Sequence, residues 1–132
     1  MKTFNTILAG LLLSMSLLAD AMASDATQAV TDGGVTVNVT YLNPKRDDGA
    51  RFQVALDTHS VNLDSYDFKT IAVLRDDSRN TYLPTAVENK GSGHHRQATV
   101  AFGKLASGAK YVELVIKDLA AIKERTFRWD LD

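Results

Sequence analysis

From residue 35 onward, apolar and polar residues alternate with a period of two. Successive side chains of a β-strand point to opposite faces, so this period is typical of strands with one buried face. No stretch of comparable length has the period of a helix. The alternation recurs in the segments 35–41, 52–57, 94–102, 112–116 and 125–131.

Shorter or more continuous patterns lie between these segments. The apolar run 68–74 suits a central strand, and 81–83 is a short strand ended by Pro84, because proline cannot donate to a ladder. Residues 85–93 are predicted as a loop, and 118–124 as either one helical turn or an irregular hairpin loop. About seven short strands separated by turn signals predict an all-β fold, an antiparallel β-sandwich.

The N-terminus has the pattern of a secretory signal peptide. Lys2 gives a positive start, 7–18 is a mostly apolar run, and Ala21-Met22-Ala23 has the small residues that a signal peptidase accepts. The run is shorter than a membrane span requires, so the cleaved protein is expected in the periplasm or outside the cell. The expected division is a signal peptide (1–23), a flexible segment (24–34) and a β-sandwich domain (35–132).

Composition excludes several kinds of site. The chain contains no Cys, and its three Met residues all lie in the predicted signal peptide. A disulfide, an iron–sulfur cluster, a c-type haem and a thioether copper site are therefore excluded from the cleaved protein. The formal net charge of −1 at pH 7 gives no reason to expect nucleic acid or an anionic membrane as a partner.

Part of the chain resembles immunoglobulin-like domains. In segment 105–115, Ser107-Gly108-Ala109-Lys110-Tyr111 leads into a strand and is similar to the loop and tyrosine corner before their penultimate strand. The succession of segments along the chain resembles small exported bacterial domains of telokin-like immunoglobulin fold. It runs from 82–84 through a glycine loop to 98–102 and then 111–114. The paired core cysteines of antibody domains are missing, and Trp129 lies on the last strand instead of the third. The resemblance implies an immunoglobulin-like sandwich and no activity, because such domains share none.

All three histidines lie where predicted strands end or begin. His59 closes one polar cluster, and His94 and His95 open the strand that ends at residue 102. In an immunoglobulin-like order these two strands pair antiparallel, and parity places His59 and His95 on the outer face with Asp57 nearby. Imidazole and carboxylate groups bind Zn²⁺ and Cu²⁺. The predicted metal ligands are His59, His94, His95 and Asp57, with Asp64 as a carboxylate that orients one of them.

Arg96 has the parity of the inward-facing residues, yet it carries a charge. An unpaired buried charge is costly, so the guanidinium needs partners. Asp57 ends the neighbouring strand, and Asp67 opens the next one across the turn. We predict a structural polar cluster of Arg96, Asp57, Asp64 and Asp67, in which charge-assisted hydrogen bonds tie Arg96 to the loop 57–67. The simpler interpretation of the histidines is then a hydrogen-bonded cap on this end of the sandwich.

No catalytic motif accompanies these residues. Ser60 and Ser92 lie near histidines, but the chain has no Gly-x-Ser-x-Gly elbow, P-loop or dinucleotide fingerprint. The charged run 123–125 fits a solvated hairpin end. We expect a non-enzymatic exported module without a cofactor, which binds a protein or a component of the cell envelope. The alternative is a periplasmic carrier of copper or zinc that uses the histidines.

Overall fold

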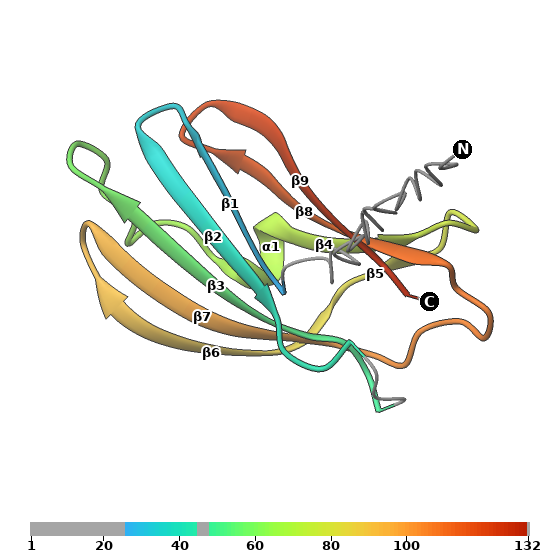
Figure 1. Ribbon diagram of the computed structural model, residues 1–132. Coiled ribbons are helices and arrows are strands. Elements are labelled where there is room, and N and C mark those ends of the chain that lie inside the picture. Colours follow the sequence, from blue (N-terminus) through green and yellow to red (C-terminus); the bar gives the residue numbers. More distant parts are fainter. Residues whose placement is uncertain (1–25, 45–47, 132) are drawn as a thin grey trace, which may run out of the picture.

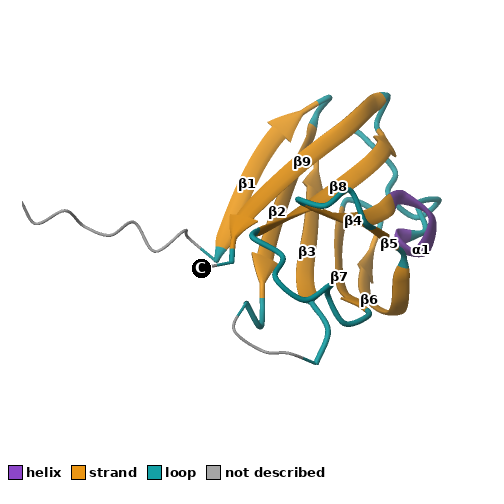
Figure 2. Ribbon diagram, turned by 90° about the vertical axis from the view of Figure 1, so that its right-hand side faces the viewer, coloured by secondary structure: helices purple, strands orange, loops and turns teal. Residues whose placement is uncertain are grey.

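The computed structural model describes residues 26–44 and 48–131, and the predicted signal peptide lies outside them. Two antiparallel sheets face each other, which confirms the predicted all-β sandwich (Figures 1 and 2). The strand order is β1-β2-β3-β7-β6 in the first sheet and β5-β4-β8-β9 in the second. The elements are β1 (Thr27–Asp32), β2 (Val35–Tyr41), β3 (Arg51–Thr58), α1 (Phe68–Ile71), β4 (Ala72–Asp76), β5 (Thr81–Tyr82), β6 (Pro84–Ser92), β7 (His95–Phe102), β8 (Tyr111–Leu119) and β9 (Ile122–Asp130).

The core lies between the two sheets and is filled by the alternating apolar positions. Along β2 and β3, every second residue is buried, as the period of two predicts. Trp129 of the last strand meets the first sheet, with its ring centroid 5.3 Å from that of Phe52 and 5.8 Å from that of Tyr41. Aromatic side chains bury large apolar areas, so this cluster is a main link between the sheets.

Two strands differ from the sequence prediction. β1 lies within the expected flexible segment, and β6 covers most of the expected loop 85–93, yet both pair along most of their length. They form the two edges of the first sheet, and most of their residues are exposed on both faces. A strand without a buried face shows no alternation, so the sequence pattern did not reveal it.

The apolar run 68–74 is not one strand, as predicted, but the helical turn α1 followed by β4. Asp67 caps the turn, because its Oδ1 accepts a hydrogen bond of 2.9 Å from the Lys69 backbone N–H. Phe68 and Ile71, three residues apart, are both buried. A short apolar run fits a buried helix or strand equally well.

No helix among the described residues is long and apolar enough to cross a membrane.

Residues 118–124 form the tip of the β8–β9 hairpin, the second of the two predicted alternatives. Leu119 pairs with Ile122, so Ala120 and Ala121 make a two-residue turn with φ of 50° and 62°. Such left-handed angles favour glycine or asparagine, and two alanines there are strained. A residue of another loop stabilises the turn, because the Ala120 backbone N–H donates a 3.0 Å hydrogen bond to the Tyr66 hydroxyl.

Arg125 is buried, although the run 123–125 was predicted to be solvated. It shares the inward parity of Phe127 and Trp129. Its guanidinium donates to the backbone carbonyls of Asp32 (3.0 Å), Val35 (3.2 Å) and Leu119 (3.1 Å), while its Nε has no partner among the described residues. Burial lowers the pKa of Arg125, and the charge of Asp32 opposes this shift. The carbonyls at a hairpin end can thus hold an inward arginine without a carboxylate.

The hydroxyl of Tyr82 joins the end of β4 to the loop that precedes β8. It donates to Asp76 Oδ2 (2.9 Å) and accepts from the Ala106 backbone N–H (2.8 Å), which fixes the loop before β8. Tyr111 of the predicted tyrosine corner is half-buried on the outward-facing side of β8. The Arg128 guanidinium carbon lies 3.6 Å from its ring centroid, a cation–π contact.

Candidate functional site

The end of β3 lies beside the start of β7, as predicted from the immunoglobulin-like order. The two strands pair antiparallel, with Asp57 directly opposite His95. Asp57 Oδ1 and His95 Nδ1 are 2.6 Å apart, a short hydrogen bond between exposed side chains. Because Nδ1 is engaged by the carboxylate, Nε2 is the ring nitrogen that remains for a further contact.

The other predicted metal ligands do not join this pair. Among residues 26–44 and 48–131, no group of three or more His, Cys, Asp or Glu side chains could hold a metal ion. The predicted ligands His59 and His94 are exposed, and the His94 backbone carbonyl accepts a 3.0 Å hydrogen bond from the Thr58 N–H. Within the predicted set, the side-chain hydrogen bond is the one between Asp57 and His95.

The loop after β3 is bonded to the turn that precedes β7. The Leu63 N–H donates to the Gly93 carbonyl at 3.0 Å, and the Gly93 N–H donates to Asp64 Oδ1 at 2.7 Å. Asp64 therefore fixes a turn and does not orient a histidine. The end of β3, its following loop and the start of β7 form one hydrogen-bonded unit, as the sequence predicts.

Arg96 is tied to this loop, but not through the carboxylates that were predicted. Its Nη1 donates to the backbone carbonyls of Leu63 (2.6 Å) and Tyr66 (2.5 Å), and its Nη2 donates to Asn89 Oδ1 (2.9 Å). The guanidinium carbon also lies 5.1 Å from the ring centroid of Phe68. The loop carbonyls take the place of a counter-ion.

The predicted polar cluster thus separates into different contacts. Asp57 binds His95, Asp64 binds the Gly93 N–H, and Asp67 caps α1. A tight loop aims backbone carbonyls inward, where each needs a donor. These acceptors belong to the backbone and do not depend on residue type, so the sequence alone points to the carboxylates as the partners of Arg96.

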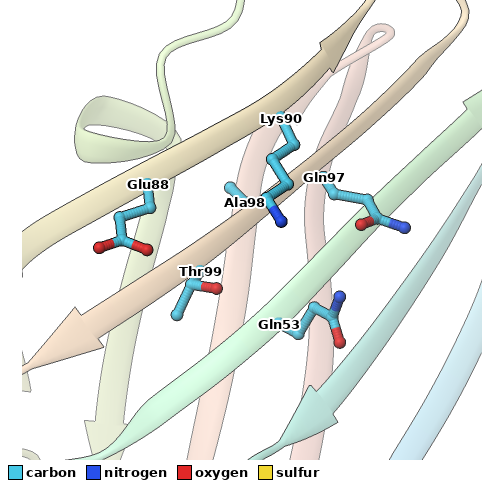
Figure 3. Close-up of a pocket in the computed structure, with 6 residues that line it drawn as sticks. All are labelled: Gln53, Glu88, Lys90, Gln97, Ala98 and Thr99. Atoms are coloured by element: carbon cyan, nitrogen blue, oxygen red, sulfur yellow. The ribbon is translucent and has the colours of Figure 1, made fainter.

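The outer face of β3, β7 and β6 contains two adjoining hollows. They share Lys90 and Gln97, and we call them together the polar trough. One, of about 110 Å³, is lined by Gln53, Glu88, Lys90, Gln97, Ala98 and Thr99 (Figure 3). The other, of about 210 Å³, is lined by Ala55, Asp57, Lys90, Gly91, His95, Arg96 and Gln97.

The sequence prediction missed this trough because it made β6 a loop. Glu88 and Lys90 point outward from β6, opposite Thr99 and Gln97 of β7. Without β6 the sheet would end at β7 and the trough would have no second wall. The sequence feature that could have indicated this strand is the spacing of Glu88 and Lys90. They are two positions apart, so both side chains lie on one face of a strand.

No known protein family matches the chain, and neither a curated protein nor a solved structure is significantly similar to it. The chemistry of the site itself is therefore the basis for a proposal. That chemistry is a solvent-facing trough of hydrogen-bonding side chains, with the Asp57–His95 pair at one end.

Proposed function

We propose that this protein is an exported, non-enzymatic binding module of immunoglobulin-like fold, which holds a protein or a component of the cell envelope in the polar trough. One observation carries the proposal. Five polar side chains from three strands converge on the trough, and none makes a hydrogen bond or ion pair with another described residue: Gln53, Glu88, Lys90, Gln97 and Thr99.

The strand order supports the immunoglobulin-like part of the proposal. Strands β2, β3, β7 and β6 follow the order A-B-E-D, and β5, β4, β8 and β9 follow C′-C-F-G, with β1 as an added edge strand. Export is supported by the pattern of residues 1–23. In such sandwiches, binding groups lie on a rigid scaffold, which lowers the entropy lost on binding.

The Ala55→Arg variant is expected to lose the partner. Ala55 lies on β3 between Gln53 and Asp57 along the outer face, and its short side chain leaves the second hollow open. A long charged side chain there would fill the trough while leaving the core untouched. The measurement is retention of partners from an envelope extract on immobilised parent and variant protein.

Ala29→Arg is the matched control for this experiment. Ala29 stands on the same outer face and in the same row, opposite Asn38, which in turn lies opposite Ala55, but it lies on the distant edge strand β1. Parent and Ala29→Arg should retain the same partner. An Ala55→Arg protein that melts like the parent and retains that partner equally well would place the binding site elsewhere.

A carrier of copper or zinc is the second proposal, and the Asp57–His95 hydrogen bond favours it. A metal-bound histidine commonly donates its other ring nitrogen to a carboxylate, which fixes the free one for the metal. A structural zinc site has four ligands, however, and the described residues provide no group of three. Calorimetric titration with Zn²⁺ and Cu²⁺ decides this, since binding weaker than about 1 mM in the parent would end the proposal.

A further inference from the structure

The trough differs from the rest of its sheet in how its polar side chains are used. Over β1 and β2, the hydroxyls of Thr27 and Thr40 lie 2.8 Å apart, as do those of Thr31 and Thr36, so these groups satisfy each other. The side chains that line the trough in Figure 3 have no such partners among the described residues. Asn38 on the outer face of β2 also has no side-chain partner among the described residues, but such groups are most numerous over β3, β7 and β6.

The kinds of groups restrict the ligand. The amides of Gln53 and Gln97 and the hydroxyl of Thr99 each donate and accept, whereas Glu88 only accepts and Lys90 only donates. The two charges cancel. An anionic ligand would meet Glu88 and Asp57, and an apolar ligand would strip water from polar groups without replacing their hydrogen bonds.

We propose that the polar trough binds a neutral oligosaccharide. Each sugar hydroxyl both donates and accepts a hydrogen bond, so it matches the amides and the threonine hydroxyl, and a pair of hydroxyls can donate to the Glu88 carboxylate. This inference rests on the proposed binding role of the trough and names the class of its ligand.

The shape of the trough fits a short chain of sugar rings. At one end of the trough, Gln53, Thr99 and Glu88 lie opposite one another on the three neighbouring strands. At the other end, Asp57 lies opposite His95. From Thr99 to His95 is four residues along β7, or about 13 Å. Figure 3 shows Gln53, Glu88, Lys90 and Gln97 on the same side of the three strands. Since all come from paired strands, the backbone fixes the spacing of these groups before the ligand arrives, while their side chains stay free to turn toward it.

The test is a titration of the ¹⁵N-labelled full chain with neutral oligosaccharides of glucose, galactose and N-acetylglucosamine, followed by NMR. We expect at least one series to shift the side-chain amide signals of Gln53 and Gln97, with tighter binding for longer chains. Ala55→Arg should weaken this binding at least about tenfold because its side chain fills the second hollow, and Gln97→Ala should do so because it removes a hydrogen-bonding amide. Ala29→Arg should bind like the parent.

Two further probes separate this inference from the proposed function. Glycylglycine or an acidic oligosaccharide that shifts the same amides, when no neutral sugar does, overturns the ligand class and leaves the trough as a binding site. The absence of any shift from the neutral panel overturns the ligand class as well, even where Ala55→Arg still abolishes retention of an envelope partner. If Ala55→Arg binds the sugar as tightly as the parent does, the sugar binds outside the polar trough.

Discussion

Arg96→Met is expected to lower the free energy of unfolding by about 3 kcal/mol, because it removes three hydrogen bonds and leaves buried acceptors without a donor. Only 8% of Arg96 is exposed, and its guanidinium bonds the carbonyls of Leu63 and Tyr66 and the amide of Asn89. Methionine keeps much of the apolar stem but cannot donate. The attachment of the loop after β3 to β7 would then rest on its hydrogen bonds to the turn that precedes β7.

Urea denaturation measures this effect, with Arg51→Met as the matched control. Arg51 is exposed at the start of β3, so the same substitution there should change the unfolding free energy by less than about 0.5 kcal/mol. Arg96→Lys keeps the charge but lacks the planar guanidinium that reaches several acceptors. Its free energy of unfolding should lie between those of the parent and Arg96→Met. Equal midpoints for parent and Arg96→Met would show that the loop is held by other contacts.

Asp76→Asn is expected to cost about 2 kcal/mol at neutral pH, because it disrupts a carboxylate held by four donors. Asp76 is 5% exposed at the end of β4. Its Oδ1 accepts from the backbone N–H groups of Ser78 and Asn80, each at 2.9 Å. Its Oδ2 accepts from the Asn80 side-chain amide at 2.8 Å and the Tyr82 hydroxyl at 2.9 Å. An asparagine amide nitrogen in place of Oδ2 would face those two donors with a donor of its own.

The effect should depend on pH in one direction. Burial opposes ionisation of Asp76, but the hydrogen bonds from Asn80, Tyr82 and Ser78 outweigh it and hold its pKa below the ordinary value of 3.8. A carboxyl with a lowered folded-state pKa contributes stability above its unfolded-state pKa and loses it as the pH falls through the folded-state pKa. The free energy of unfolding of the parent should therefore exceed that of Asp76→Asn by a constant amount at neutral pH. This difference in unfolding free energy should shrink below about pH 4.

Unfolding curves at several pH values test this, with Glu113→Gln as the control. The Glu113 side chain stands on the outward-facing side of β8 and makes no hydrogen bond with another described residue, so its replacement should have little effect at neutral pH. A parent-to-Asn difference that stays constant down to pH 2 would mean that the Asp76 carboxylate is not stabilised in the folded state.

The sequence by itself determined which segments with a buried face become strands. The segments 35–41 and 52–57 appear as β2 and β3, because a period-two pattern fits one face of a sheet to a core wherever the strand lies. Parity also predicted that Asp57 and His95 share the outer face, but their pairing followed only from an assumed strand order that makes β3 and β7 neighbours. Parity is a local property that a strand carries with it, whereas register depends on the neighbouring strand.

Only the tertiary structure decided the edges, the buried arginines and the trough. β1 and β6 show no buried face, so their neighbours and not their own pattern make them strands. Arg96 and Arg125 are held by backbone carbonyls, whose directions are set by loop geometry and not by residue identity. The trough exists because β6 pairs with β7 and brings Glu88 and Lys90 beside Gln97 and Thr99. Such contacts depend on how distant segments are placed, which a local pattern does not encode.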